Sequence, residues 1–321
     1  MALAPTEVTN DEVWPPLPFV AWQETLETLH RWTQIVGKVK LALCPFLNEW
    51  WQVTLHLTAR GLTTGPVPYG PLVFQVDFDF LAHALTIQTS DGRAQVLPLR
   101  PRSVADFYRA FLAALRTLGI EVTINPIPSE IADPIPCDQD HVHAAYDPDA
   151  VQRWWRILLQ TERVLQRYRS PFVGKSSPVH FFWGSFDLNH ARFSGRPAPP
   201  LAGAPRFFQL AEDQENIACG FWPGQANHAG VVLGEPAFYA YIYPAPPGIE
   251  VARVQPSAAT YDATLGEFIL RYEDARRAPS PEQAILEFFR STYEVSATLA
   301  GWDRAALERP DLPEVLAGHA R

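Results

Sequence analysis

Several features that assign a chain to a class are scarce in this sequence. It has three cysteines among 321 residues, Cys44, Cys137 and Cys219, and they are far apart and form no C-x-x-C pair. A disulfide framework is therefore not expected, and a reducing cytoplasm is the expected location. No stretch approaches the roughly 18 consecutive apolar residues of a membrane span. The N-terminal segment lacks the basic and apolar regions of a signal peptide, so neither a leader nor a membrane is predicted.

Basic residues are also under-represented. Lys and Arg number 26 against 35 Asp and Glu, which gives a formal net charge of -9. This balance argues against non-specific binding to nucleic acid or to an anionic membrane. An acidic protein can still hold a local basic pocket, so a small-molecule ligand, including an anionic one, remains a candidate partner. The sequence indicates neither a cofactor nor an oligomeric state.

What is present is typical of a globular chain with a large core. Hydrophobic residues make up 47% of the sequence and charged residues 19%, and 31 prolines favour turns over long helical bundles. Apolar residues recur at helical spacing in four segments, each of which we expect to form a helix. These segments are residues 21–36, a helix capped by Ser103 and Asp106 and stopped by Gly119, a helix with Asp147 as N-cap and Pro148 first, and a helix capped by Ser280 with Pro281 next.

Between these helices the pattern changes to period two, which predicts strands. The candidates in the first half are residues 50–59 and 71–80 and the segments ALTIQTS and AQVLPL. In the second half they are VHFFWGSFDL, NIACGFW, AFYAYIY and GEFILRY. Within residues 71–80, polar and apolar side chains alternate, as in an antiparallel sheet with one solvated face.

The same order of elements occurs twice. Each half has a Trp-bearing helix, a Pro-Phe step, a set of strands, an Arg-rich loop and a Ser-capped aromatic helix. The sequence therefore predicts an α+β fold of two duplicated halves, each a mainly antiparallel sheet flanked by two helices, in one compact unit over residues 1–320. We expect the first half at residues 15–125, a Pro-rich linker at 126–146, and the second half, with an insertion, at 147–310.

A group of motifs in the second half carries a family resemblance. PVHFFWGSFDL, RFSGR, GFWPG, AFYAYIYP, LGEFILRYE and STYE resemble an uncharacterised bacterial family, a domain of unknown function. The resemblance covers nearly the whole chain from Trp14 to Trp302 and implies a single domain family. It implies no activity, so the function has to be sought in the residues themselves.

The segment that begins at His180 is the first candidate site. As one regular strand it would place Trp183, Ser185 and Asp187 on one face, with His180 on the other, unless Gly184 forms a bulge. Arg192 and Arg196 follow in what reads as a loop and could form bidentate contacts with a carboxylate or phosphate. The plainer alternative is an amphipathic strand with a solvated face and a local Asp–Arg pair.

Three other chemistries are weaker in this sequence. Ser185 with His180 or His190 lacks the spacing of a nucleophile elbow. VGKSSP lacks the first glycine of a phosphate-binding loop, so Lys175 and Ser176 are expected to be ordinary polar contacts at the site. His141 and His143 could form a pair of metal ligands or could lie in a solvated linker, and no metal site is predicted.

Aromatic residues supply the last candidates. Trp222, Tyr239 and Tyr241 could stack on a ligand or could pack between sheets. The favoured hypothesis is binding of a polar or anionic small molecule in a pocket of the second half. One alternative is a hydrolase or transferase that uses Asp187 with Glu215 or Glu235 as acid and base. The other is an interaction protein with an exposed aromatic surface.

Overall fold

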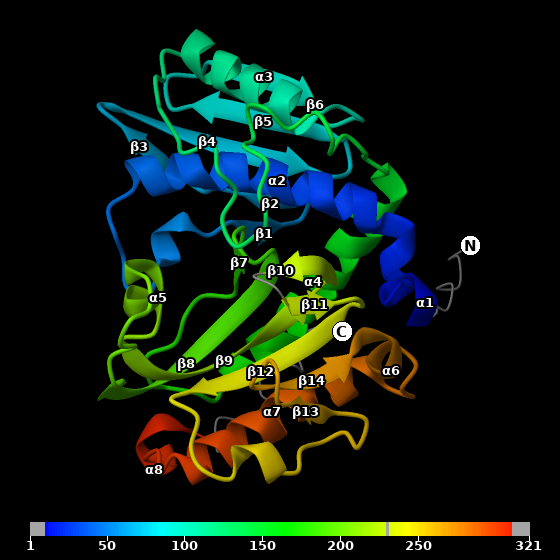
Figure 1. Ribbon diagram of the computed structural model, residues 1–321, viewed down its shortest axis with the longest axis vertical. Helices are drawn as coiled ribbons and strands as arrows, with labels where there is room; N and C mark the ends of the chain where they lie inside the picture. The colour runs from blue at the N-terminus through cyan, green and yellow to red at the C-terminus, as the bar shows by residue number, and fades with distance from the viewer. Residues whose placement is uncertain (1–9, 229–230, 310–321) are drawn as a thin grey trace, which may run out of the picture. The chain divides into compact units, whose positions relative to one another are not determined.

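The computed structural model describes residues 10–228 and 231–309, which form two compact units (Figure 1). The first unit comprises the chain up to Gln160 together with His180–Leu188 and Phe221–Ala237. The second unit comprises Thr161–Val179, Asn189–Gly220 and the chain from Phe238 onward. The boundary between Gln160 and Thr161 falls inside one helix, α4, which runs from Pro148 to Arg169.

The first unit combines helices with an antiparallel sheet. Its elements are α1 (Asn10–Val13), α2 (Phe19–Leu43), the 3-10 helix η1 (Trp51–Val53), β1 (His56–Thr58), β2 (Gly61–Thr63), β3 (Val67–Tyr69), β4 (Leu72–Asp79), β5 (Ala84–Thr89), β6 (Ala94–Pro98), α3 (Val104–Thr117), β7 (His180–Phe182), β10 (Gln225–His228) and β11 (Val231–Leu233). The sheet has the order β1-β2-β4-β5-β6, with β3 paired to β4. Strands that pair in this sheet are therefore close to one another in the sequence, as expected for antiparallel strands joined by short turns.

One face of this sheet is apolar, as the period-two pattern predicts. Phe74, Val76 and Phe78 are buried on β4, and Val76 and Phe78 pair in register with Ile87 and Leu85 of β5. The alternate residues of β4 are only partly buried, which leaves a polar second face. The alternation of residues 71–80 thus predicts correctly which face of β4 is buried.

Helix α2 is the central element of the first unit. Most of its length is buried, including several polar side chains, and it stacks against α3 through the rings of Trp32 and Phe107, whose centroids lie 4.7 Å apart. Gly37 allows the Trp183 indole to lie directly against the backbone of α2. A Cβ at this position would overlap the Trp183 indole, whose Nε1 donates to the carbonyl of Val53 at 2.7 Å.

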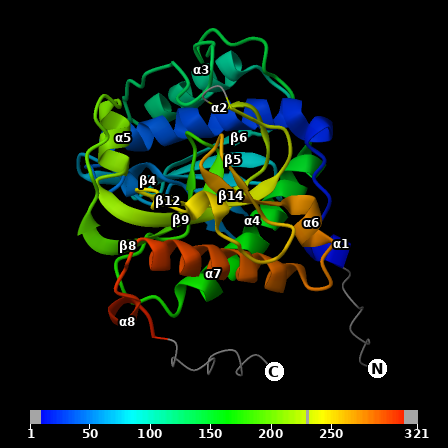
Figure 2. The same cartoon turned by 60° about the horizontal axis from the view of Figure 1, so that its bottom comes forward.

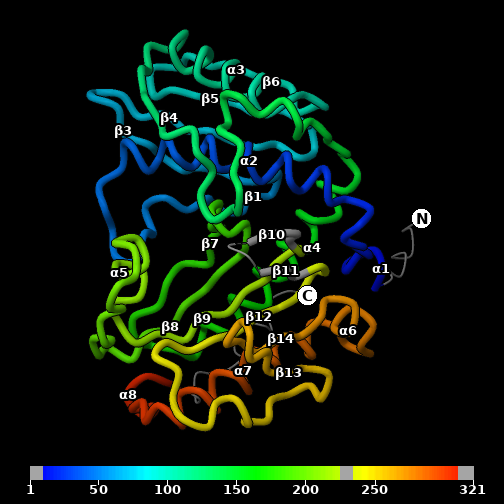
Figure 3. Tube along the Cα trace, in the orientation of Figure 1, coloured from blue at the N-terminus to red at the C-terminus, as the bar shows by residue number. Residues whose placement is uncertain are grey.

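Residues 126–146, expected as a linker, lie along α2 in the first unit (Figure 3). The side chain of Gln34 donates to the carbonyl of Ser129 at 2.9 Å and accepts from its amide at 2.7 Å. Lys38 donates to the carbonyl of Ile127. Asp140 and Cys137 in the same segment are almost fully buried. The segment is therefore fixed to α2 by hydrogen bonds and a few buried side chains, while most of its residues stay partly exposed.

The second unit pairs a twisted sheet with α7 (Pro281–Leu299). Its remaining elements are β8 (Asp187–Pro197), α5 (Arg206–Ala211), β9 (Gln214–Trp222), β12 (Ala237–Tyr243), η2 (Ile249–Val251), β13 (Thr260–Asp262), β14 (Glu267–Arg271), α6 (Tyr272–Arg276) and α8 (Arg304–Leu307). The second sheet has the order β13-β14-β12-β9-β8-β7. Figure 2 shows α7 running along this sheet, and the rings of Phe238 on β12 and Phe289 on α7 are 6.0 Å apart.

The class predicted from the sequence, α+β with two antiparallel sheets, is confirmed. Each sheet has six strands, and each is preceded by a long helix and followed by an amphipathic one. This repeated order is what an internal duplication would produce. None of the described helices is both long enough and apolar enough to cross a bilayer.

The helix starts predicted at Ser103, Asp147 and Ser280 are confirmed, but only the first two of these residues cap the helix with a side-chain hydrogen bond. The Ser103 hydroxyl accepts from the amide of Asp106 at 3.1 Å, and Asp147 accepts from the amide of Asp149 at 2.9 Å. Ser280 precedes α7 but makes no capping hydrogen bond with its side chain. Pro281 favours a helix start here in another way, because proline presets the helical φ and has no N–H to leave unpaired at the first helical position.

The prediction of one strand over VHFFWGSFDL is also wrong. The chain forms β7 from His180 to Phe182, turns through residues 183–186, and resumes as β8 at Asp187. Phe186 has φ 60°, in the left-handed region that a side chain with a Cβ rarely adopts. The expected loop after Asp187 is likewise wrong, because Arg192 and Arg196 both lie on β8, which continues to Pro197.

Candidate functional site

A cavity of about 300 Å³ in the second unit is lined by charged and aromatic side chains around a buried arginine. Its lining comes from four parts of the chain. Tyr168 and Pro171 lie at and just beyond the end of α4, Arg192 on β8, Arg290, Tyr293 and Glu294 on α7, and Arg304 and Glu308 at and after α8. Cavities of this size hold small molecules of a few to a dozen heavy atoms.

Arg192 is the deepest charged group of the cavity, with 3% of its surface exposed. Aromatic rings surround its guanidinium: Cζ lies 3.6 Å from the ring centroid of Tyr168, 4.3 Å from that of Tyr293 and 4.9 Å from that of Phe172. One Nη2 donates to the carbonyl of Tyr168. Each ring face attracts the cation, but weakly compared with a carboxylate in direct contact.

The charge of Arg192 has no direct counter-ion in the part of the chain that the structure describes. No carboxylate there forms an ion pair with it, and its buried Nε has no hydrogen-bond partner among residues 10–228 and 231–309. A buried cation is normally paired with a counter-ion and has its N–H groups hydrogen-bonded. The arrangement is therefore suited to an anion that is not a fixed part of the described protein.

Glu308 is the carboxylate that comes nearest to this role, but it is held by other donors. It accepts from Arg304 at 2.6 Å to Oε1 and 3.1 Å to Oε2, and from the hydroxyl of Tyr293 at 2.8 Å. Burial acts to raise the pKa of Glu308, but the Arg304 and Tyr293 hydrogen bonds and the charges of Arg304 and Arg192 outweigh it and lower the pKa. Glu308 is therefore ionised at neutral pH.

The rim of the cavity is formed by one face of α7. Arg290, Tyr293 and Glu294 have the i, i+3, i+4 spacing that puts three side chains side by side. Arg290 and Glu294 are exposed. With three arginines and two glutamates, the lining residues carry one formal positive charge in excess within a protein of net charge -9. The site is locally basic.

Behind Arg192 the cavity is closed by groups that stay neutral. Burial raises the pKa of the Cys219 thiol to about 12, although the nearby Arg192 acts in the opposite direction. Burial also raises the pKa of Tyr168 well above its usual value. Neither group can supply a negative charge to Arg192 near pH 7, so the charge has to be balanced from the open side.

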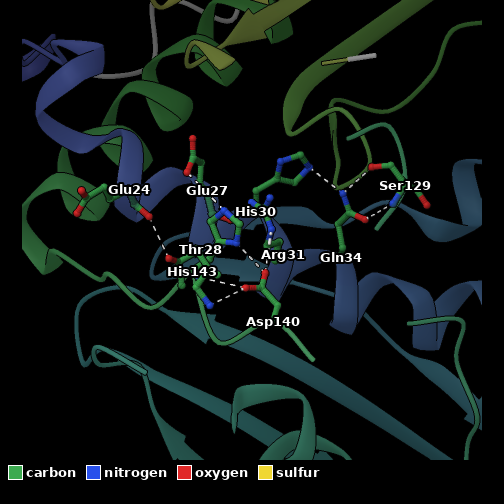
Figure 4. A network of polar contacts seen from close by, with 10 residues as sticks. Glu24, Glu27, Thr28, His30, Arg31, Gln34, Ser129, Asp140 and His143 are labelled. Carbon is green, nitrogen blue, oxygen red and sulfur yellow. Dashed lines mark hydrogen bonds and ion pairs between the residues drawn. The ribbon is translucent and has the colours of Figure 1, made fainter. Parts of the chain in front are cut away.

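A second polar group lies in the first unit, between α2 and the segment that follows α3 (Figure 4). Asp140 is fully buried and accepts from His143 Nδ1 at 2.7 Å, and it pairs with Arg31 at 3.3 Å. His143 Nε2 lies 3.6 Å from Glu27. These contacts fix the segment to α2. No set of three or more metal-ligating side chains occurs among the described residues, and His141 is exposed while His143 belongs to this network.

The same face of α2 also reaches the turn between β7 and β8. His30 Nε2 lies 2.9 Å from the carbonyl oxygen of Gly184 and 2.9 Å from the Gln34 amide nitrogen. Ser185 donates to Asp187, whose carboxyl is buried. A Cβ on Gly184 would overlap the carboxyl of Glu130. Burial, and secondarily the charge of Asp187, raises the pKa of Glu130 to about 7.

The site residues predicted from the sequence are divided between the two units. His180, Trp183, Ser185, Asp187 and Trp222 belong to the first unit. His180 is buried against Phe182 and Trp51, with ring centroids 4.7 and 6.3 Å away. Trp183 packs on Gly37 and Trp222 ends β9. The prediction that Trp183, Ser185 and Asp187 share one strand face is wrong, because residues 183–186 form a turn.

The other predicted residues belong to the second unit. The backbone of Ser176 pairs with that of Arg192, and Lys175 donates to Gln214 at 3.2 Å. Tyr239 accepts from Asn189 at 2.8 Å and is 2% exposed, whereas Tyr241 is partly exposed and donates to Glu212 at 3.3 Å. The lining of the cavity includes Arg192 and none of the other ten predicted residues.

Arg196 has a different place from the one expected. It pairs with Glu215 at 2.6 Å and donates to the carbonyls of Ala300 at 2.9 Å and Gly301 at 3.2 Å. These carbonyls belong to the C-cap of α7, Ala300, and to the next residue, where an arginine is favourable at a helix C-terminus. Glu215 is thus the ion-pair partner of Arg196. Glu235, the other alternative acid or base, is partly buried.

Sequence reasoning missed most of the cavity. Arg290, Tyr293 and Glu294 could have been found from their helical spacing on a face of α7 that mixes charge with an aromatic ring. His30, Gln34 and Lys38, spaced by four within a buried helix, would have indicated a polar contact face on α2 in the same way. Glu130 carries no local pattern, because a loop brings it to its site. Glu308 lies four residues after Arg304, the spacing of a helical ion pair, and its contact with Tyr293 is the part that no local pattern shows.

The profile of a family of unknown function, DUF5996, matches residues 14–309 of the chain. No curated protein and no solved structure matches it.

Proposed function

Because the chain belongs to the DUF5996 family, whose function is unknown, the function has to be inferred from its own chemistry, and we propose that it binds a small anionic molecule in the cavity around Arg192. The observation that carries the proposal is the buried guanidinium of Arg192, which lines a cavity, forms no ion pair in the described chain and keeps its Nε without an acceptor there.

Desolvation explains why such a group favours a ligand. A cation removed from water loses several kcal/mol of hydration, of the order given for buried ions. The rings of Tyr168 and Tyr293 recover part of this loss. An anion that enters the cavity would recover more, since charge-assisted hydrogen bonds are about twice as strong as neutral ones. Arg290 at the rim adds a second cation for the same ligand.

The size and charge of the surroundings support a small anion rather than a polyanion. The volume of about 300 Å³ suits a molecule such as a dicarboxylate or a phosphate monoester. A nucleic acid would meet the remaining surface of a protein with net charge -9, which disfavours it. We also propose a cytoplasmic location, which is supported by three free cysteines with no pairing among them.

The proposal is tested by calorimetric titration with two probes, succinate and inorganic phosphate. Arg192→Gln should abolish binding. Arg290→Gln, at an exposed position that folding does not depend on, should weaken it about fivefold, as expected for roughly 1 kcal/mol from an exposed charge. The matched control is Arg206→Gln, an exposed arginine of α5 outside the cavity, which removes the same charge and should change the affinity less than about twofold.

Two outcomes would contradict the proposal. The proposal fails if neither probe binds the wild-type protein at millimolar concentration, and it fails if Arg290→Gln and Arg206→Gln weaken binding equally. The second result would mean that net charge, and not the cavity, attracts the anion. Because Arg192 is buried, the fold of its variant has to be checked by circular dichroism, and Arg192→Lys serves as the variant that keeps the charge but loses the planar fork.

A second candidate function, acid–base catalysis, is favoured by Glu130. We propose it with Asp187 as before, but with Glu130 rather than Glu215 or Glu235 as the other carboxyl. The support is the pKa of Glu130, raised to about 7 by burial and by Asp187, which suits a group that exchanges protons at neutral pH. Turnover of ester, phosphate or glycoside substrates that disappears in both Asp187→Asn and Glu130→Gln would support it. Turnover that survives in either variant would exclude it.

A further inference from the structure

The cavity already contains a carboxylate-binding arrangement, and the chain itself fills it. Arg304 holds the carboxylate of Glu308 with two nitrogens, Nε at 2.6 Å and Nη2 at 3.1 Å, and Tyr293 donates its hydroxyl at 2.8 Å. Two parallel bonds from one guanidinium to two carboxylate oxygens are specific for a planar, two-oxygen anion. The geometry thus identifies the chemistry that this end of the cavity recognises.

The segment that supplies Glu308 is attached to the rest of the second unit by a small number of contacts. Residues 305–309, which follow Arg304, are here called the C-terminal strap. The amide of Val173 donates to the carbonyl of Leu307 at 2.8 Å, and the amide of Arg309 donates to the carbonyl of Pro171 at 2.8 Å. No residue of α8 is buried. A segment with few buried contacts and two backbone bonds opens at low cost relative to the core.

Arg192 interacts electrostatically with Glu308 but forms no ion pair with it. Its field is one of the influences that lower the pKa of Glu308, yet no ion pair joins the two side chains in the described structure. Glu308 therefore partly neutralises the cavity from its Arg304 side. A ligand that carried a carboxylate could take over the Arg304 and Tyr293 donors and bring its other polar groups to Arg192.

From this geometry we infer that Glu308 is an internal ligand of the cavity, and that the external ligand is a carboxylate that displaces it and releases the C-terminal strap. The inference rests on the proposed function, which it deepens by naming the ligand class and the residue that competes with it. Glu308 would then set the affinity of the site: only a carboxylate that binds better than an intramolecular one is admitted.

The test compares Glu308→Gln with Glu294→Gln in titrations with succinate and with inorganic phosphate. Both variants remove one negative charge from the lining of the same cavity, but only Glu308 occupies the Arg304–Tyr293 donors. Glu308→Gln should bind succinate about tenfold more tightly than the wild type, because a neutral amide competes poorly for a guanidinium. Glu294→Gln should change the affinity about twofold at most.

The outcomes separate the inference from the proposed function. If the wild type binds succinate through Arg192 and Glu308→Gln binds no more tightly than Glu294→Gln, the competition is refuted while anion binding stands. If phosphate gains as much as succinate in Glu308→Gln, the carboxylate class is refuted. If no variant binds either anion, the proposed function fails and the inference fails with it.

A second measurement keeps the inference testable if Glu308→Gln perturbs the fold. Hydrogen exchange of the wild-type protein reports the strap directly, because the amide of Arg309 is bonded to Pro171 and that of Glu308 to Arg304, at 2.8 and 2.9 Å. Saturating succinate should accelerate exchange at these two amides several-fold. Slower exchange on binding would show that the ligand closes the strap rather than displacing it, and would overturn the inference.

Discussion

The environment of the Glu130 carboxyl differs from what its position in the sequence suggests. The residue follows a Pro-rich stretch, yet it adopts φ 57° and places its carboxyl against Gly184, where a Cβ would overlap it. Burial is the main reason that its pKa rises from the ordinary 4.5 to about 7, and the nearby charge of Asp187 adds to it. The folded protein therefore prefers the neutral acid at this position.

This preference makes the free energy of unfolding depend on pH. The unfolded chain loses the Glu130 proton near pH 4.5 and the folded chain near 7, so between these values the folded state binds more protons and stability falls as the pH rises. The loss reaches about 3 kcal/mol, since each unit of pKa shift corresponds to about 1.4 kcal/mol. Glu130→Gln should match the wild type at pH 4 and exceed its stability at pH 8 by up to this amount.

Urea unfolding at pH 4 and pH 8 gives the change in unfolding free energy with pH for each protein. Subtracting the change of Glu130→Gln from that of the wild type removes the contributions of all other titrating groups. Glu24→Gln, at an exposed position of α2, is the control and should leave the pH dependence as it is in the wild type. If Glu130→Gln loses stability at pH 8, the carboxylate form is stabilised by contacts that outweigh its burial, and the assigned direction of the pKa shift is wrong.

What the sequence reveals about single residues depends on whether their neighbours are local. Arg192 was identified because an arginine after an aromatic strand suggests anion contacts, although it lies on β8 rather than in a loop. Asp187 was identified from the same segment. Glu130 was missed because Gly184, against which its carboxyl lies, is 54 residues away. Glu308 was missed because the i, i+4 pair that it forms with Arg304 does not reveal its contact with Tyr293, 15 residues away.

At the scale of elements, the helix caps offer a matched pair of predictions. Ser103 accepts from the amide of Asp106 at 3.1 Å, whereas Ser280 makes no capping bond although it also precedes an aromatic helix. Ser103→Ala should therefore lower the free energy of unfolding by about 1 kcal/mol, the usual contribution of a serine cap. Ser280→Ala should change it by less than about 0.5 kcal/mol. Thermal or urea unfolding of the two variants checks both values.

Equal losses in the two variants would mean that Ser280 caps α7 in solution through a bond absent from this structure. The contrast also shows where pattern reading succeeds. A capping box needs residues three apart, which the sequence displays, but whether the hydroxyl turns inward depends on the backbone before the helix. Ser280 has φ -137° and ψ 92°, unlike Ser103 with φ -64° and ψ 152°.

The β7–β8 turn was missed for a related reason. A turn is usually recognised in a sequence by Gly, Asn or Asp at the residue with a left-handed backbone conformation, but here Phe186 is that residue. Its ring stacks on Trp154 at 4.9 Å and contacts Phe181 at 5.0 Å. Tertiary packing on these rings stabilises a backbone conformation that the local sequence disfavours, so alternation alone predicted a continuous strand.

At the scale of the whole molecule, the duplicated order of helix, sheet and helix was predictable, because it depends on periodicity summed over many residues. The division into units was not, since the segments 180–188 and 221–237 group with the first unit although they lie in the second half of the sequence. The unit to which a segment belongs is decided by its contacts in three dimensions, which no local pattern encodes.

Helix α4 gives this division a measurable consequence. It carries residues of both units without a break, and helix formation is cooperative along its length. We therefore expect both units to lose their structure in one transition. The buried thiols of Cys137 in the first unit and Cys219 in the second report it, because burial shields both and raises their pKa to about 11 and about 12. Both should become reactive at the same urea concentration.

Pulsed labelling with iodoacetamide at pH 8, followed by peptide mass spectrometry, resolves the two cysteines without mutation. Cys44, which is only partly buried, should react before the transition and provides the internal control for labelling. Midpoints for Cys137 and Cys219 that differ by more than about 0.5 M urea would show independent units, since such a gap corresponds to about 1 kcal/mol at ordinary m-values. Succinate, if it binds near Arg192, would then raise only the midpoint of Cys219, whereas in a single cooperative transition it has to raise both equally.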